Sequence, residues 1–210
     1  YELGLKAQWL DKKLYTELAF YTVQVSDLLV AERVDNDQFV GRNAGKTSHN
    51  GIEVLMNYKD RTFNSLLINP YASLTINDYS FEDFTDNDID YAGNDLTGVA
   101  DKVFNLGLDL IHDSGLRFNV NYRHTGEIPL DDANSIYSDS YNLVNLRADY
   151  EFKIAQHFTT TLYSGVNNVF DTNYAAQVLP NATGFGGAAP RYYYPGEPVN
   201  FYIGLNLNIF

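Results

Sequence analysis

Residues 199–209 read Val-Asn-Phe-Tyr-Ile-Gly-Leu-Asn-Leu-Asn-Ile, and apolar and polar side chains alternate along the whole stretch. Successive side chains of a β-strand point to opposite faces of the sheet, so this segment predicts a strand with one apolar face and one amide-rich face. The same period of two recurs upstream, for example at residues 116–122 and 144–152. Helical spacing is hard to find. The sequence therefore predicts an all-β protein.

Segments with this alternation predict about nine strands along the chain. We place them at residues 1–10, 14–26, 40–58, 62–77, 102–112, 116–125, 140–154, 158–170 and 196–210. Pro70 lies inside the fourth predicted strand. Because proline has no N–H to donate to a neighbouring strand, this position requires a sheet edge, a bulge or a strand end.

The connections between these strands alternate strictly between short and long. The short ones are residues 11–13, 59–61, 113–115 and 155–157, and the long ones are residues 27–39, 78–101, 126–139 and 171–195. Antiparallel neighbours joined in this way place all short turns at one end of the sheet and all long loops at the other. Outer-membrane barrels have this arrangement, with short periplasmic turns and long extracellular loops. We therefore predict an antiparallel up-and-down transmembrane β-barrel, with a soluble β-sandwich or jelly roll as the alternative.

Composition narrows the classes of function. The chain has 210 residues, no cysteine, and 14 basic against 27 acidic side chains, which gives a net charge of −13. It therefore has no disulfide framework and no thiolate metal or redox site, and its charge argues against a nucleic-acid partner. No stretch approaches the roughly 18 consecutive apolar residues of a membrane helix, and no signal peptide is visible at the start. Polar strand faces rich in Asn, Gly and Asp suit a water-filled lumen.

No group of residues has the spacing of a catalytic or metal-binding motif, so we predict no enzyme, no metal and no cofactor. The four histidines are scattered over different strands and turns: His49, His112, His124 and His157. The acidic segment 78–95 superficially resembles a calcium loop, but Tyr91 and Thr97 stand where an EF-hand needs Gly and Glu. We interpret it as a solvated extracellular loop. An adventitious divalent-cation site that bridges lipopolysaccharide phosphates is the alternative.

Two groups of residues are candidates for contact with a ligand. Arg191, Tyr192, Tyr193 and Tyr194 end the last long loop and offer one positive charge, hydroxyl groups and stacking faces to an anionic or aromatic ligand. Tyrosines at a strand entrance are equally typical of the aromatic girdle at a membrane interface. The second group contains the arginines predicted to face the lumen: Arg117, Arg123 and Arg147. They either line a ligand path or, as we favour, form ion pairs inside the barrel with Asp109, Asp149 or Glu151.

Several short blocks occur in a fixed order on these strands and loops. They are Tyr-Glu-Leu-Gly-Leu-Lys (1–6), Trp-Leu-Asp (9–11), Asn-Ala-Gly-Lys (43–46), Gly-Ile-Glu-Val (51–54), Gly-Asn-Asp-Leu-Thr-Gly-Val-Ala (93–100), Asn-Leu-Gly-Leu (105–108), Val-Asn-Asn-Val-Phe-Asp (166–171) with Tyr174, and Tyr-Pro-Gly-Glu-Pro (194–198). In this order they resemble the C-terminal part of TonB-dependent outer-membrane receptors of the siderophore-receptor type. The resemblance covers essentially the whole chain. Thr97 and Ala100 replace frequent prolines of the family, and Val199 replaces a frequent arginine.

The resemblance implies a complete barrel of about 22 strands around an N-terminal plug, of which residues 1–210 are the final nine strands, with the plug and earlier strands absent. It implies import of a ferric siderophore or similar large nutrient with energy from TonB, and contact with outer-membrane lipid and lipopolysaccharide. The family usually ends in an outward aromatic residue that the barrel-assembly machinery reads; here Ile209 has the lipid-facing phase and Phe210 follows it. A passive porin-like or adhesin-like barrel and a soluble β-sandwich binding module remain the alternatives.

Overall fold

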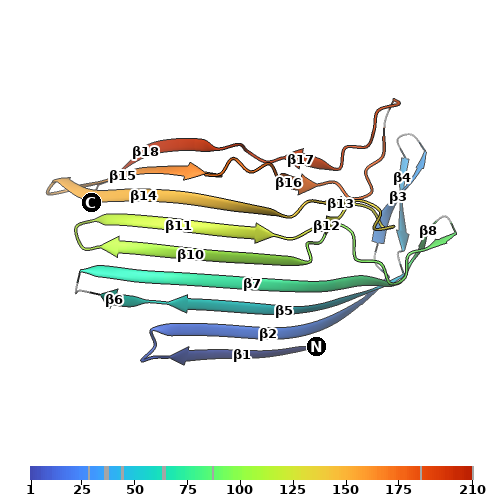
Figure 1. The fold of residues 1–210 in the computed structure, drawn as a ribbon, viewed down its shortest axis with the longest axis horizontal. Helices are drawn as coiled ribbons and strands as arrows, with labels where there is room; N and C mark the ends of the chain where they lie inside the picture. Colours follow the sequence, from blue (N-terminus) through green and yellow to red (C-terminus); the bar gives the residue numbers. More distant parts are fainter. Residues whose placement is uncertain are drawn as a thin grey trace.

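The computed structural model describes residues 1–27, 29–35, 38–43, 45–62, 65–86, 88–184 and 186–209. Its main feature is one antiparallel sheet in which nine long strands neighbour one another in chain order (Figure 1). These strands are β1 (Glu2–Trp9), β2 (Leu14–Ser26), β5 (Lys46–Tyr58), β7 (Leu66–Asp83), β10 (Lys102–His112), β11 (Leu116–Thr125), β14 (Tyr141–Ala155), β15 (Phe158–Asn167) and β18 (Asn200–Ile209). The predicted up-and-down order of nine strands is confirmed.

The remaining strands of the described chain are short. β6 (Asp60–Thr62) pairs with β7, and the others form two-stranded hairpins within the long connections. These hairpins are β3 (Leu29–Asp35) with β4 (Gln38–Asn43), β8 (Thr85–Asp86) with β9 (Ile89–Asp90), β12 (Ile128–Pro129) with β13 (Tyr137–Ser138), and β16 (Ala175–Val178) with β17 (Tyr193–Pro195). In the described part of the chain no second large sheet faces the first, so the β-sandwich and jelly-roll alternatives are wrong.

Three predicted boundaries are also wrong. The predicted strand 40–58 is divided into β4 and β5, because Gly45 between them has a φ of +63°, a left-handed conformation that ends a strand. β7 continues to Asp83, so the acidic segment 78–95 begins inside the sheet and not in a loop. The predicted turn 59–61 is part of strand pairing, since β6 continues the ladder of β5 beside β7.

Pro70 explains this last difference. It lies inside β7 and pairs with Leu108 of β10. On its other side, pairing with β5 ends at Asn57 opposite Tyr71, and pairing with β6 begins at Asp60 opposite Ile68. The ladder is therefore interrupted beside the residue that has no N–H to donate. A break in the neighbouring strand, and not a sheet edge, accommodates the proline.

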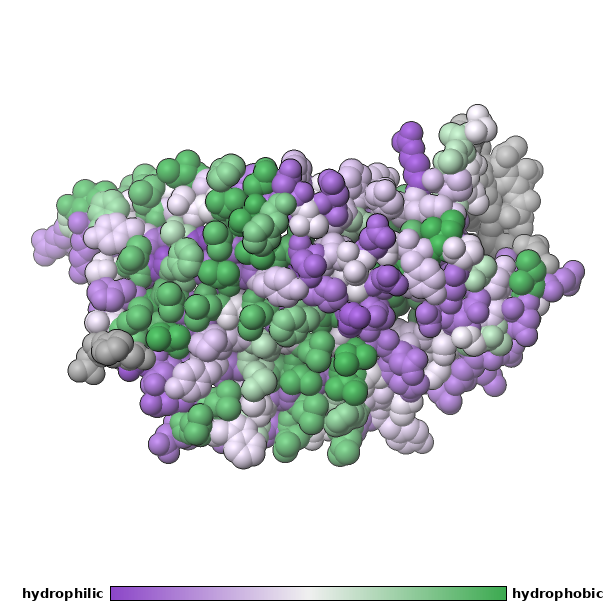
Figure 2. Space-filling model, in the orientation of Figure 1, coloured by the Kyte–Doolittle hydropathy of each residue, from purple (hydrophilic) through white to green (hydrophobic). Residues whose placement is uncertain are grey.

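One face of the sheet is apolar and exposed. Along β18, Phe201 and Ile203 expose 77% and 76% of their surface, and Leu3 of β1 exposes 75%. Figure 2 shows hydrophobic side chains gathered over the strands, whereas hydrophilic ones predominate at the loop end. Buried hydrophobic residues are few in the described chain: Phe81, Phe84 and Leu130. A sheet with so little core and so large an apolar surface suits a lipid environment. No helix of the described residues is long and apolar enough to cross a membrane.

The opposite face is polar and contains a repeated contact between tyrosine and glycine. In four places a tyrosine ring lies over a glycine of the paired strand, at the position that a Cβ atom would occupy. The pairs are Tyr21 with Gly51, Tyr71 with Gly107, Tyr202 with Gly165 and Tyr163 with Gly204. An aromatic ring that covers a glycine protects the backbone and restores packing that glycine lacks. These pairs therefore fix neighbouring strands on the inner face.

Candidate functional site

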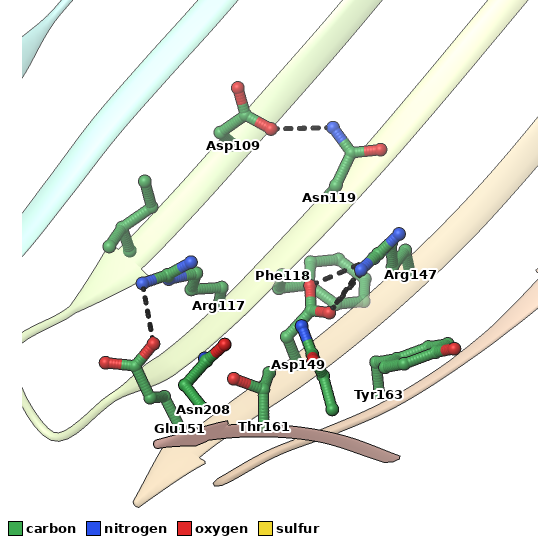
Figure 3. Close-up of a pocket in the computed structure, with 12 residues that line it drawn as sticks. Asp109, Arg117, Phe118, Asn119, Arg147, Asp149, Glu151, Thr161, Tyr163 and Asn208 are labelled. Atoms are coloured by element: carbon green, nitrogen blue, oxygen red, sulfur yellow. Dashed lines mark hydrogen bonds and ion pairs between the residues drawn. The ribbon is translucent and has the colours of Figure 1, made fainter. Parts of the chain in front are cut away.

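The polar face has a hollow of about 540 Å³ near the short turns that join β10 to β11 and β14 to β15. Figure 3 shows that its side chains come from neighbouring strands and point into a common space. Most of its lining residues are polar, and five of them are charged: Asp109, Arg117, Arg147, Asp149 and Glu151. Because the strands alternate, most apolar neighbours of these residues lie on the other face, and Ile111 and Phe118 are the apolar residues that line the hollow. The hollow is therefore part of the polar inner wall.

Most of these charges neutralise one another. Arg147 Nη2 lies 2.7 Å from Asp149 Oδ1, and the Arg147 guanidinium lies 5.1 Å from the centre of the Tyr163 ring. Arg117 Nη2 lies 3.5 Å from Glu151 Oε2. The favoured interpretation of Arg117 and Arg147 as members of interior ion pairs is thus confirmed. This arrangement is typical of a structural network on a wet barrel wall.

Asp109 has a different environment. Its carboxylate accepts hydrogen bonds from Nδ2 of Asn119 at 2.7 Å and of Asn69 at 2.9 Å, and it has no cationic partner among the described residues. Arg123 likewise forms no described ion pair, and its Nε donates to Thr125 Oγ1 at 3.3 Å. The hollow therefore combines a paired region with one amide-supported carboxylate.

Three long loops meet at the other end of the sheet. We call residues 84–101, 126–140 and 168–199 the first, second and third loop. Six residues make most of the side-chain hydrogen bonds between them, and we call this group the loop clasp: Asn94, Asp95, Thr97, Asp132, Asn134 and Asn181. Backbone groups add three contacts between loops, from Gly98 N to Pro129 O at 2.9 Å, from Asp101 N to Glu127 O at 3.3 Å and from Asn181 N to Leu130 O at 2.8 Å. The loops are therefore connected directly to one another.

Carboxylates of the clasp affect nearby tyrosines. Burial raises the pKa of Tyr137, and Asp95 beside its hydroxyl raises it further. Burial likewise raises the pKa of Tyr91, with smaller contributions from Asp86 and Asp132. Both side chains stay protonated and available as hydrogen-bond donors at neutral pH. Among the residues that the structure describes, no group of three or more His, Asp or Glu side chains is placed to hold a metal ion.

The predicted ligand-binding residues do not form one site. Tyr193 and Tyr194 belong to β17 and expose 55% and 58% of their surface, and Arg191 is exposed beside them. We call residues 175–195 the tyrosine hairpin. Arg147 lies in the hollow on the inner wall, which contains neither Arg123 nor any residue of the hairpin. Contact of these residues with a ligand stays a prediction.

Sequence reasoning missed the role of the block at residues 166–171. Asn168 is 3% exposed, its Nδ2 donates to the backbone oxygens of Thr172 and Glu197, and its Oδ1 accepts from Thr172 N. Asp171 Oδ1 accepts from Val199 N at 2.9 Å. These bonds join the start and the end of the third loop. The signal in the sequence was a pair of short polar residues directly after a strand, which are typical of structured turns.

The end of β18 is described as far as Ile209, which is 69% exposed and shares the apolar face with Phe201 and Ile203. It therefore continues the apolar face of β18, and its contact with lipid stays a prediction. The prediction for Phe210 lies outside the described residues.

The fold and its two faces define a class of protein: part of an outer-membrane β-barrel, with an apolar outer surface and a polar lumen. A family model described as TonB dependent receptor-like, beta-barrel, matches residues 1–169. The chain therefore belongs to this family, as the resemblance implied. The family consists of transport receptors and not of enzymes.

Similar proteins agree with this assignment. A ferrichrome outer membrane transporter and phage receptor of Escherichia coli (strain K12) is 26% identical over 192 residues, which cover 90% of this chain and 24% of the relative. The siderophore receptor PiuA of Acinetobacter baumannii matches all of this chain and 28% of its own, at 18% identity and a TM-score of 0.72. The structure of the ferric preacinetobactin receptor BauA of the same organism matches 98% of this chain and 28% of its own chain, at 15% identity and a TM-score of 0.71. The chain thus spans about a quarter of these relatives.

Proposed function

We propose that the chain is the C-terminal part of a receptor that imports a ferric siderophore, or a similar large nutrient, across the bacterial outer membrane. The family match over residues 1–169 is the observation that carries this proposal. The names of the three relatives, a ferrichrome transporter, a siderophore receptor and a ferric preacinetobactin receptor, support the substrate class. The apolar outer face and polar inner wall suit a barrel that transports a hydrophilic cargo.

In this proposal the remaining part of the receptor supplies the earlier strands and an N-terminal plug. β1 and β18 are the two edges of the described sheet, and both run toward the short-turn end (Figure 1). Unpaired backbone groups at such edges are costly in hydrocarbon. Because the two edges are parallel, an odd number of further strands closes the barrel with antiparallel neighbours throughout. The length of the relatives, about four times that of the chain, leaves room for these parts.

The long loops then face the outside of the cell and the short turns face the periplasm. Lipopolysaccharide surrounds the loop end, and the missing N-terminal part contacts TonB, which supplies the energy for plug movement. The barrel-assembly machinery recognises the last strand through Ile209 and the residue after it. These partners follow from the family and not from a contact in the described chain.

Within the loops, the tyrosine hairpin is the proposed contact with the cargo. Tyr193 and Tyr194 are more than half exposed, and Arg191 adds a positive charge with no described partner. Aromatic faces and a guanidinium bind planar or anionic iron chelates by stacking, cation–π contact and charge-assisted hydrogen bonds. Arg123 and Arg147 are assigned to the inner wall along the later path of the cargo.

The test is an uptake assay with the full-length receptor in a host that lacks its own siderophore receptors and is starved of iron. Radioactive iron is supplied as hydroxamate, catecholate or mixed complexes. We expect saturable uptake of at least one complex, and its loss when TonB is deleted. A passive barrel would give uptake that does not saturate and does not need TonB, and this result would refute the proposal. Tyr193→Ala is expected to weaken uptake, whereas Tyr150→Ala on the outer face serves as the matched control.

A further inference from the structure

One asparagine of the second loop contributes a pair of hydrogen bonds to the first loop. Asn134 Nδ2 donates to Asp95 O at 3.0 Å, and Asn134 Oδ1 accepts from Asp95 N at 2.6 Å. One side-chain amide thus pairs with both backbone groups of one residue in the other loop, as a neighbouring strand does. Asp95 is separated from Asn134 by 39 residues. This contact is therefore a tertiary connection and not a local turn.

An asparagine of the third loop makes a second pair of hydrogen bonds, to one residue of the second loop. Asn181 Oδ1 accepts from Asp132 N at 3.1 Å, and Asn181 Nδ2 donates to Asp132 Oδ2 at 3.0 Å. Asn181 and Asn134 both have a left-handed backbone, with φ of +54° and +52°. Asparagine tolerates this conformation better than most residues, and its amide supplies a donor and an acceptor together. Both requirements explain why asparagine stands at each junction.

Asp132 connects the two junctions. Its Oδ1 accepts a short hydrogen bond from Thr97 Oγ1 of the first loop, and its backbone oxygen accepts from Asn94 Nδ2 at 2.7 Å. Its Oδ2 and its N–H are bound to Asn181 of the third loop. One residue of the second loop therefore contacts both neighbours.

We propose that the loop clasp makes the three long loops open and close as one body and that it fixes the position of the tyrosine hairpin. Asn181 lies in the hairpin, between β16 and β17. Close beside it, Leu179 N donates to Tyr192 O at 2.6 Å, which joins the two sides of the hairpin. The part of this inference that concerns cargo contact rests on the proposed function. The mechanical coupling of the loops does not.

Amide hydrogen exchange of the full-length receptor in detergent micelles, without cargo, tests the coupling. The variant Asn134→Gly keeps the left-handed backbone accessible and removes the amide that binds the first loop. Asn134 makes no described contact with the third loop, yet we expect exchange of residues 175–182 to become roughly tenfold to thirtyfold faster, the effect of two lost hydrogen bonds. Reciprocally, Asn181→Gly is expected to accelerate exchange of residues 93–98 by a similar factor.

Asn173→Ala is the matched control, because Asn173 is an exposed asparagine of the third loop that has no described hydrogen bond. It should leave all three loops at the wild-type rate. If Asn134→Gly accelerates only the first and second loops, the loops open independently and the proposal is overturned. Exchange of β10 and β11 reports whether a variant still folds. The hydrogen-exchange result does not depend on uptake. If the receptor imports no ferric complex, the proposed function is refuted, but the coupling of the loops is not.

Discussion

Replacement of Gly107 by alanine places a methyl carbon 1.9 Å from Cζ of Tyr71 and 2.3 Å from its hydroxyl oxygen. Non-bonded atoms cannot lie this close to one another, so the Tyr71 ring must leave its position over the β10 backbone. It then loses its packing on that backbone, worth about 1 kcal/mol for an aromatic contact, and it adopts a less favourable side-chain conformation at a cost of about 1 kcal/mol. Alanine regains about 0.7 kcal/mol because it is less flexible than glycine in a strand. The expected net loss of stability is about 1 kcal/mol.

The sign of the effect should reverse when the ring is absent. In the Tyr71→Ala background nothing obstructs the new methyl group, so Gly107→Ala should stabilise the protein by about 0.7 kcal/mol. The two changes together define a double-mutant cycle with a coupling free energy of about 2 kcal/mol. Equilibrium unfolding of the full-length receptor in detergent by guanidinium, followed by tryptophan fluorescence, gives the four stabilities.

Gly4→Ala is the control, because the nearest described atom to its added methyl group is Leu18 O at 3.6 Å, an ordinary contact distance. It should stabilise the protein by about 0.7 kcal/mol, and by the same amount in either background, so that its coupling free energy with Tyr71→Ala stays below about 0.5 kcal/mol. A coupling free energy below about 0.5 kcal/mol for Tyr71 and Gly107 would show that the ring moves away without cost. The packing of tyrosine on glycine would then contribute nothing to the wall, and the reasoning would be refuted.

Three other changes test separate features. Asn168→Ala removes several hydrogen bonds of a buried amide and should lower the unfolding free energy by about 2–4 kcal/mol. The control Asn167→Ala should lower it by only about 1 kcal/mol. Equal losses of the two variants in guanidinium unfolding would contradict the role of the buried amide. Arg147→Met leaves Asp149 without its cation and should cost about 1–3 kcal/mol, and an additional Asp149→Asn change should restore part of this loss. The pKa of Tyr137 is raised above its ordinary value of 10.0, mainly by burial, so the folded protein retains a proton that the unfolded chain releases. The contribution of Tyr137 to the free energy of unfolding is therefore complete below about pH 10 and is lost as the pH rises through the raised pKa. The difference in ultraviolet absorbance between wild type and Tyr137→Phe should titrate above about pH 10. A titration midpoint at or below about pH 10 would contradict the assignment.

The long strands could be predicted because their signal is local. The bounds of β2, β10 and β11 agree with the predicted ranges 14–26, 102–112 and 116–125, since alternation begins and ends sharply there. The hairpins β8–β9 and β12–β13 could not be predicted, because strands of two residues carry no period. The extent of β7 was underestimated because its last residues, Asp78–Asp83, carry charge. In fact they continue the alternation, with Tyr79 and Phe81 in one phase.

The candidate site was predicted only where partners are close in sequence or on adjacent strands. Arg147 and Asp149 are two residues apart on one strand, so they share a face and their pairing follows from the pattern. The tyrosine–glycine pairs require the register between strands, which a one-residue shift would destroy. The contacts of Asn134 and Asn181 depend on how separate loops meet. Nothing in the local pattern encodes that arrangement.

The base of the third loop has a consequence for how such a receptor can diversify. Asn168 and Asp171 join residues next to β15 to residues next to β18, so the strand register is fixed before the chain enters the tyrosine hairpin. The entropic cost of closing a longer loop grows only slowly with its length. The length of the segment between these contacts can therefore change while the register of β15 and β18 is kept. Variation in this loop therefore does not have to alter the pairing of the strands on either side of it.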